Sequence, residues 1–275
     1  MKVIYEPKGA AREYAPLACN IYLGCTHGCK YCYAPATLRK KPEEFYSDPA
    51  PRKTFLQDFE DDCVKLSKRP DDENRRVLLS FVGDPYQPCE EKLLLTRQAI
   101  AIATSIGIKL DVLTKGKYKL VSRDFDIMKE NGTRLGVSLV WRDDTLRKQF
   151  EPNASTVADR IAILKEAHDY GIETWISVEP VIYGGQALDL MQLLNSPDDP
   201  CVDFWKIGKL NHVKEEKAIK GKEKWMWFMA YASGSLPESK RLFKKSLVEA
   251  AKEEMALSDW KPFTKCPELE ENGRA

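Results

Sequence analysis

Short apolar runs alternate with segments of helical spacing along most of this chain, and this alternation limits the possible folds more than any other feature. Strands that alternate with helices at such spacing form a parallel sheet. There are six such units, too few for the closed eight-stranded barrel. The sequence therefore predicts an α/β fold of the partial (β/α)6, TIM-like barrel kind. The runs that we expect to form its strands are 18–21, 77–82, 108–113, 135–140, 173–178 and 202–207.

Turn and capping residues predict where the elements begin and end. Ser122 and Ser155 are expected to cap the helices that follow them, because a serine hydroxyl accepts a hydrogen bond from a free backbone N–H in the first turn. Residues 90–104 have the spacing of a single helix. Glu179-Pro180 is expected to end the fifth strand. Reactive residues should then gather at the C-terminal ends of the strands, as they do in full barrels.

The pattern changes after residue 208. Residues 209–224 are polar and rich in lysine, 225–231 are strongly apolar, and a helix is expected from about 237 to 255. We therefore expect a barrel domain at 1–208 and a C-terminal helical extension at 209–275 that packs on the barrel.

Charge and composition restrict the function classes. Lys and Arg total 43 and Asp and Glu total 42, which gives a net charge of +1. A protein that relies on bulk attraction to nucleic acid usually carries a clear basic excess, so any such role must depend on a local patch. The chain begins without a signal-like apolar run and has no membrane-length one. Its eight cysteines are too sparse for a disulfide scaffold. We expect a cytoplasmic protein with reduced thiols and no membrane partner.

Three of those cysteines form a tight group, Cys25, Cys29 and Cys32, just after the first predicted strand. Four thiolates complete a structural zinc site or an ordinary iron–sulfur cluster. Three thiolates can instead hold three irons of a [4Fe–4S] cube and leave the fourth iron open to a ligand. The alternative is a zinc site that borrows His27 or a distant cysteine, but zinc loops more often use paired C-x-x-C hairpins and no second pair exists here.

The cysteine segment resembles that of radical S-adenosylmethionine (SAM) enzymes, and in particular the spore photoproduct lyase-like, or "DNA repair photolyase", branch. The similarity covers roughly residues 18–181. The segments that carry it, in chain order, are Asn20–Ala34, Gly83–Glu90, Thr114-Lys115, Arg123-Asp124, Glu151-Pro152 and Arg160.

The resemblance implies a chemistry and its cofactors. In such enzymes the open iron of a [4Fe–4S] cluster binds the amino and carboxylate groups of SAM. One electron from the reduced cluster then cleaves the sulfonium to methionine and a 5′-deoxyadenosyl radical, which abstracts a hydrogen atom from the substrate. The cofactor supplies the difficult chemistry and the protein positions it. A flavodoxin- or ferredoxin-like protein is the expected reductant.

The resemblance also implies roles for individual residues, beginning with the three cysteines as iron ligands. Tyr31 would border the adenine, and the loop at Gly83-Asp84 would receive the methionine amino group. Lys115 is a candidate for the methionine carboxylate or the substrate, and Ser138 for the carboxylate or ribose. Glu179 could bind the ribose or a substrate group. The alternatives are a turn residue for Asp84, a solvated lysine, a strand serine bonded to backbone, and a structural carboxylate for Glu179. Glu151 carries the same ambiguity.

Two further features remain open at this point. Cys19 and Cys89 are candidate hydrogen-atom donors, because a thiol S–H bond is weak, although free cysteines are commonly small buried hydrophobes. Basic and aromatic residues could also hold a nucleic-acid backbone and stack bases, or form a solvated helix face and an ordinary core. They are Arg39, Lys40, Lys41, Arg52, Lys53, the basic segment 240–245 within the helix expected at about 237–255, Tyr33, Tyr86, Trp225 and Trp227.

We therefore expect a radical SAM enzyme with a nucleic-acid substrate, as in the nearest named branch. The competing enzyme hypothesis is modification of a peptide or small molecule. The hypothesis from another class is a non-catalytic, zinc-stabilised nucleic-acid-binding module.

Overall fold

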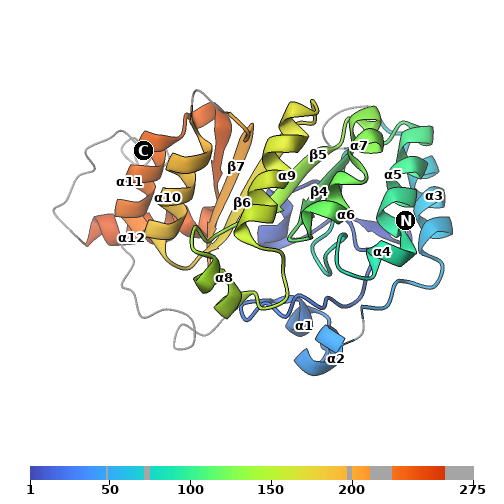
Figure 1. Ribbon diagram of the computed structural model, residues 1–275, viewed down its shortest axis with the longest axis horizontal. Coiled ribbons are helices and arrows are strands. Elements are labelled where there is room, and N and C mark those ends of the chain that lie inside the picture. The colour runs from blue at the N-terminus through green and yellow to red at the C-terminus, as the bar shows by residue number, and fades with distance from the viewer. Residues whose placement is uncertain (48, 71–74, 197–199, 211–224, 258–275) are drawn as a thin grey trace.

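An eight-stranded sheet forms the centre of the computed structural model, which describes residues 1–47, 49–70, 75–196, 200–210 and 225–257 (Figure 1). The strands lie side by side in chain order, and only β1 runs antiparallel to its neighbour. The sheet is open, because β1 and β8 form its two edges. The strands are β1 (Ile4–Tyr5), β2 (Leu17–Cys19), β3 (Val77–Leu79), β4 (Leu110–Thr114), β5 (Arg134–Ser138), β6 (Thr174–Val181), β7 (Phe204–Lys209) and β8 (Arg241–Phe243).

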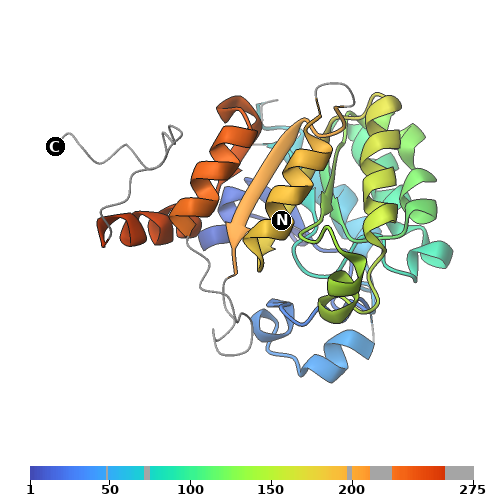
Figure 2. The ribbon, with the colours of Figure 1, turned by 60° about the vertical axis from the view of Figure 1, so that its left-hand side comes forward.

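Helices cover the outer side of this sheet, and neighbouring helices along the chain pack on one another (Figures 1 and 2). The two short helices α1 and α2 lie apart, beyond one end of the sheet (Figure 1). The helices are α1 (Ala34–Thr37), α2 (Pro42–Ser47), α3 (Phe55–Leu66), α4 (Glu90–Leu93), α5 (Leu95–Ile106), α6 (Tyr118–Ser122), α7 (Phe125–Asn131), α8 (Asp144–Phe150), α9 (Val157–Asp169), α10 (Gly184–Leu194), α11 (Trp225–Ser235) and α12 (Lys245–Ala256), with 3-10 turns at Gly9–Glu13 and Glu238–Lys240.

The two faces of the sheet differ because successive side chains of a strand point to opposite sides. On β6, Ile176 and Val178 belong to the large core between sheet and helices. Trp175 belongs to a small second core on the inner face, and Ser177 and Glu179 share that face. Gly136 on β5 makes room there, since a Cβ at this position would lie 2.2 Å from the Trp175 ring.

The predicted fold class is confirmed: the protein is an open, mostly parallel α/β sheet of the partial-barrel kind. All six predicted strands are present, and β1 and β8 are added. The helix expected from about 237 to 255 is present from Lys245 onward as α12, but its first part is wrong, because residues 241–243 form strand β8. Arg241 and Phe243 are buried on either side of the half-buried Leu242 in β8, and a three-residue strand is too short to show a period in the sequence.

The predicted ends of several elements are also corrected. Strand β6 continues through Glu179-Pro180, because the register with β7 shifts between Val178 and Val181 and so passes over the proline, which has no N–H to donate. Segment 90–104 is two helices separated at Leu94, whose φ is +54°.

The helix caps differ from the prediction as well. Ser122 ends α6, and Asp124 takes the position before α7. The cap of α9 is Thr156 rather than Ser155, since Thr156 and Asp159 form a reciprocal capping box.

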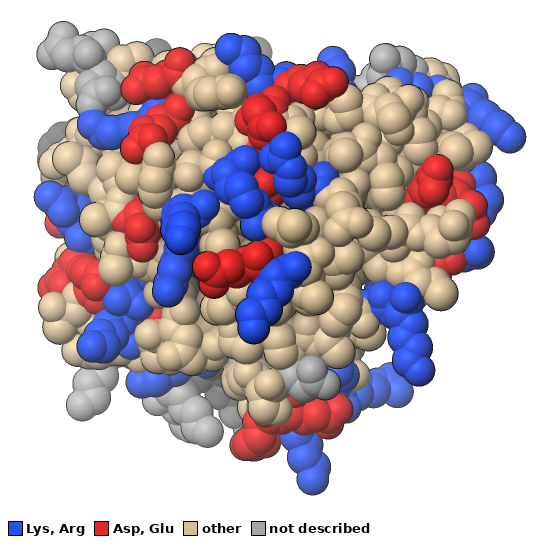
Figure 3. Space-filling model, turned by 45° about the vertical axis from the view of Figure 1, so that its right-hand side comes forward, with Lys and Arg blue, Asp and Glu red and all other residues tan. Residues whose placement is uncertain are grey.

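The C-terminal residues 225–257 extend both layers of the fold. Strand β8 pairs with β7, α11 packs on α10, and α12 packs on α11 and β7 (Figure 2). Most of the lysine-rich stretch, 211–224, lies outside the described residues. On the face in Figure 3 basic and acidic side chains are interspersed, in keeping with the net charge of +1. Among the described residues, no helix has the length and apolar character needed to cross a membrane.

Candidate active site

A cavity of about 460 Å³ lies on the inner side of the sheet, where the parallel strands end. Residues at or just after the C-terminal ends of strands β3 to β8 line it, together with the cysteine loop and the segment before β2. This is the placement that the strand-end prediction required. The predicted site residues that line the cavity are Cys25, Cys29, Tyr31, Cys32, Gly83, Asp84, Lys115, Ser138 and Glu179.

The cysteine loop between β2 and α1 is held by backbone hydrogen bonds to two other segments. The N–H of Cys25 donates to the carbonyl of Phe45 at 3.0 Å, and the N–H of Lys30 donates to the carbonyl of Phe150 at 2.9 Å. Burial raises the pKa of Cys25 to about 12 and also raises the pKa values of Cys29 and Cys32. Their thiolates would therefore need a cationic centre to persist at neutral pH.

The three thiols do not form a preformed site for a single metal ion. Two thiolates on one tetrahedral zinc lie about 3.8 Å apart, given a Zn–S distance near 2.3 Å. Within the described part of the chain, no three His, Cys, Asp or Glu side chains form a group of that kind. Three thiolates are one fewer than the four ligands of a structural zinc site, and they match a [4Fe–4S] cube with one open iron, so the donor set fits a cluster better than a lone zinc.

Asp84 joins the cysteine loop to the end of β4. Its carboxylate accepts hydrogen bonds from the Thr114 hydroxyl and the Lys115 N–H, both at 2.6 Å, and from the Tyr86 N–H at 2.8 Å. Nδ1 of the buried His27 lies 3.6 Å from the same carboxylate. Asp84 is therefore more than a turn residue, because its side chain fixes two loops that line the cavity.

Tyr31 is held by a buried ion pair. Its hydroxyl donates to Glu151, which pairs with Arg160 at 2.5 Å; the side chains of Glu151 and Arg160 are fully buried. Arg160 also donates to the backbone carbonyl of Ser138 at 2.8 Å. Although burial acts to raise the pKa of Glu151, the charge of Arg160 lowers it below the usual value. Glu151 does not line the cavity, so the structure favours its structural role. The Lys115 ammonium lies 5.8 Å from the centre of the Tyr31 ring.

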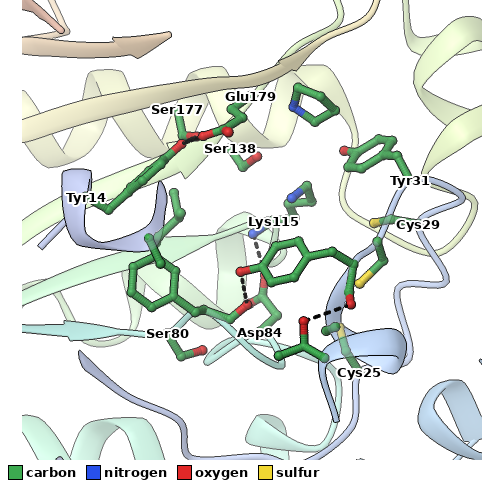
Figure 4. Close-up of a pocket in the computed structure, with 18 of the residues that line it drawn as sticks. Tyr14, Cys25, Cys29, Tyr31, Ser80, Asp84, Lys115, Ser138, Ser177 and Glu179 are labelled. Carbon is green, nitrogen blue, oxygen red and sulfur yellow. Dashed lines mark hydrogen bonds between the residues drawn. The ribbon is translucent and has the colours of Figure 1, made fainter. Parts of the chain in front are cut away.

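The other end of the cavity contains a second cluster of polar groups (Figure 4). The Tyr14 hydroxyl donates to Glu179 at 2.5 Å and shares a hydrogen bond with Ser177 at 2.7 Å. The buried Lys244 lies 3.4 Å from the same carboxylate. Gly208 leaves room for this group, since a Cβ there would lie 2.8 Å from the carboxyl carbon of Glu179. We refer to Tyr14, Ser177, Glu179 and Lys244 as the distal cluster.

Sequence reasoning finds only Glu179 of the distal cluster. Ser177 carries a usable signal, because it lies two residues before Glu179 and so shares its face of β6. Tyr14 precedes the first predicted strand and Lys244 falls within a predicted helix, so neither carries a signal.

The two candidate hydrogen donors lie outside the cavity. Cys19 is fully buried on the face of β2 that packs against the helices, beside Leu17 rather than Ala18. Cys89 is half-buried at the start of α4 and packs against the same core. Neither lines the cavity, because strand alternation turns Cys19 outward and the 83–90 loop carries Cys89 away.

The expected nucleic-acid surface is only partly assembled. Tyr33 lines the cavity and is 38% exposed, whereas Tyr86 is fully buried. Trp225 and Trp227 lie on α11 in the helix layer. Arg241 and Lys244 are buried, so the predicted basic helix face is wrong. In the cluster-side loop, Lys40 donates to the carbonyl of Leu23 at 3.1 Å.

An open, mostly parallel α/β sheet whose strand ends share one cavity with three cysteines is the architecture of a class of enzymes. The chain belongs to the radical SAM superfamily, whose family model matches residues 19–195. Membership implies an iron–sulfur cluster, SAM and an electron donor.

Related sequences occur in bacteria and archaea. An uncharacterised protein of Mycobacterium tuberculosis is 28% identical over 176 residues, which cover 59% of this chain and 48% of the relative. An uncharacterised protein of Methanocaldococcus jannaschii is also 28% identical, over 165 residues, covering 59% of each chain. The chain thus spans about half the length of the mycobacterial relative.

Two solved structures share the fold. Spore photoproduct lyase complexed with dinucleoside spore photoproduct superposes with a TM-score of 0.63 at 19% identity, covering 87% of this chain and 80% of the lyase. Streptococcus suis SuiB bound to S-adenosylmethionine superposes with a TM-score of 0.59 at 14% identity, covering 90% of this chain and 53% of SuiB. Both likenesses concern the fold.

Proposed function

We propose that this enzyme reductively cleaves SAM at a [4Fe–4S] cluster held by Cys25, Cys29 and Cys32, and uses the 5′-deoxyadenosyl radical to abstract a hydrogen atom from nucleic acid. The observation that supports this most strongly is that the three thiols and the expected SAM-binding residues line one cavity. A flavodoxin- or ferredoxin-like protein is the proposed reductant and the cytoplasm the proposed location.

The residues of the chain have distinct tasks in this proposal. When bound, the cluster supplies the electron that breaks the sulfonium bond of SAM. Tyr31, fixed by Glu151, provides a wall for the adenine. The loop at Gly83-Asp84 faces the methionine amino group, and Lys115 and Ser138 face the methionine carboxylate and ribose. Glu179 lies at the opposite end, where the ribose or the substrate would bind.

The choice of substrate rests on two considerations. The segments that resemble the photolyase-like branch include Gly83–Glu90, and the lyase that shares the fold is described with a dinucleoside photoproduct. SuiB, which shares the same fold, is described with a precursor peptide, so fold alone does not decide the substrate. Peptide-modifying relatives often carry a cysteine-rich extension, and here only Cys201 and Cys266 follow Cys89 in the sequence.

The domain arrangement is part of the proposal. Residues 1–208 would form the catalytic barrel, and 209–275 an extension packed on it. The extension would also add an edge strand to the barrel sheet and a residue to the cavity, because β8 pairs with β7 and Lys244 lines the cavity.

The first test is anaerobic purification and reconstitution, followed by reduction with SAM. We expect about four irons with sulfide per chain and the formation of 5′-deoxyadenosine. One colourless zinc per chain would instead support the zinc-stabilised module, and an intact cluster that leaves SAM uncleaved would contradict the proposal.

The second test concerns the substrate. Binding of DNA or RNA in a gel shift should weaken steeply with salt, because phosphate contacts release counterions. Binding that does not change with salt would remove the preference for nucleic acid over a peptide.

A further inference from the structure

Gln87 joins the cysteine loop to the segment after β3 and is fully buried. Its side-chain N–H donates to the carbonyl of Gly24 at 3.2 Å, and its side-chain oxygen accepts from the N–H of Thr26 at 3.1 Å. The two hydrogen bonds flank Cys25 on both sides. The amide of Gln87 therefore fixes the backbone on either side of one cysteine.

Two other residues of the 83–90 segment, Gly83 and Glu90, also contact the chain that leads into the cysteine loop. Gly83 has a φ of +74°, and a Cβ there would lie 2.9 Å from the Gly24 carbonyl and 3.0 Å from the Tyr22 carbonyl. At the far end Glu90 accepts a hydrogen bond from the Tyr22 hydroxyl. The two segments are thus in close contact from Tyr22 onward, and Gln87 is the member whose side chain reaches both neighbours of Cys25.

This contact brings backbone donors to the sulfur of Cys25. Burial and the charge of the Asp84 carboxylate raise the pKa of the Cys25 thiol, whereas hydrogen bonds from the backbone N–H groups of His27 and Asp84 act to lower it. One of these donors belongs to the cysteine loop and the other to the 83–90 segment. Their simultaneous approach to the sulfur depends on the register of the two segments, which Gln87 holds.

The chemistry at this position suits an amide of this length. One backbone acceptor and one backbone donor must both be satisfied, and a glutamine offers a donor and an acceptor at once. Glutamate would keep the bond to Thr26 but place a carboxylate against the Gly24 carbonyl. An apolar side chain would leave both buried backbone groups without a partner, which is costly.

We propose that Gln87 is a positioning residue that holds the Cys25 sulfur against the N–H groups of His27 and Asp84 and so raises the reduction potential of the cluster. The inference rests on the proposed function, in which Cys25 is an iron ligand. Hydrogen bonds to cluster sulfurs stabilise the extra negative charge of the reduced state, and outer partners of this kind tune metal sites. Without the Gln87 bonds, the sulfur would lose donors and the cluster would be harder to reduce.

The test compares Gln87→Met with a matched control, Asn131→Leu. Asn131 makes the same pair of backbone bonds, donating to the Ile108 carbonyl at 2.9 Å and accepting from the Leu110 N–H at 3.1 Å. Its side-chain oxygen also accepts from the Thr133 hydroxyl at 2.9 Å. It lies near the start of β4, at the opposite end of the strand from the cavity. Both variants should lower the melting temperature by a similar amount, because each leaves two backbone groups unpaired.

Only Gln87→Met should move the midpoint potential of the reconstituted cluster, measured by a titration followed with electron paramagnetic resonance. We expect a shift to more negative values and SAM cleavage slowed by about 10- to 100-fold, with Asn131→Leu unchanged in both. Gln87→Asn, which adds no charge and shortens the side chain by one methylene, serves where Gln87→Met fails to fold, and it should shift the potential in the same direction.

The outcomes separate this inference from the function on which it rests. A variant with full iron content and the wild-type potential and spectrum would overturn the role of Gln87 and leave the function intact. An equal shift in Asn131→Leu would also overturn it. A wild-type protein that assembles no cluster would overturn both.

Discussion

The two ends of the cavity are built in different ways. At the cysteine end, two short segments, 22–32 and 83–90, lie against each other and are joined by several contacts to backbone groups. The distal cluster brings single side chains from segments before β2, on β6 and after β8. At the cysteine end these contacts therefore hold the backbone itself in place. The distal cluster is held by contacts between side chains, so one of its residues can be substituted with less effect on the backbone. Sites that hold a cofactor need the first arrangement, and sites that adapt to a substrate tolerate the second.

The largest expected difference between the two ends concerns cofactor assembly. Replacement of any one cysteine, as in Cys25→Ala, Cys29→Ala or Cys32→Ala, should abolish the cluster and all SAM cleavage, because two thiolates cannot hold the cube. Iron and sulfide content after reconstitution measures the effect. Cys89→Ala is the matched control, since this half-buried thiol does not line the cavity, and it should keep full iron. A loss of iron in the control, or its retention in a trio variant, would refute the ligand assignment.

The next difference concerns stability, and it compares two ion pairs. Arg160→Met should lower the free energy of unfolding by about 3–5 kcal/mol, because it leaves the Glu151 carboxylate buried without its partner. Both side chains of this pair are 0% exposed, whereas Glu179 in the distal pair is 18% exposed. Lys244→Met should therefore cost less. Urea unfolding of the cluster-free protein measures both, and a larger loss for Lys244→Met would reverse the comparison.

The same buried pair predicts a pH dependence. The pKa of Glu151 is lower in the folded protein than in the unfolded chain, despite burial, because of the Arg160 charge. The unfolded state therefore binds the proton more readily, and the stability from this group is present above about pH 4.3 and lost as the pH falls through the lower, folded pKa. In Glu151→Gln that part of the acid sensitivity should vanish. Equal slopes of unfolding free energy against pH in both proteins, below about pH 4.3, would contradict this assignment.

The contrast between the two ends also explains what the sequence can predict. The cysteine spacing is local, and the ends of neighbouring parallel strands must meet, so the sequence alone places Asp84, Lys115 and Ser138 in one site. Cys19 is different. It is close to Cys25 in the sequence, which suggests a place near the cluster, but side-chain alternation on β2 turns it to the face opposite the cavity. The next residue, Asn20, makes contacts on the other side of the chain. Its side-chain oxygen accepts hydrogen bonds from the N–H groups of Phe81 and Val82, at 3.0 and 2.9 Å, in the segment that follows β3.

The distal cluster is largely invisible in the sequence for a different reason. Tyr14 lies outside the strand–helix repeat, and Lys244 follows a three-residue strand that has no detectable period. Long-range side-chain contacts of this kind depend on how the edge strands pack, which a single sequence does not encode locally.

The smallest expected effect belongs to Tyr14→Phe. This change removes one hydroxyl that bonds to Glu179 and Ser177, at 2.5 and 2.7 Å, while the ring keeps its edge contact with Phe81. The loss of stability should be about 1 kcal/mol. Cluster content and SAM cleavage without substrate should equal the wild type, because no cysteine-end residue loses a partner. Turnover of a substrate, once found, should fall, since Glu179 loses its orientation. A fall in substrate-free SAM cleavage would mean that the distal cluster contacts SAM itself, as it would if Glu179 bound the ribose rather than the substrate, and the division of the cavity into a cofactor end and a substrate end would be wrong.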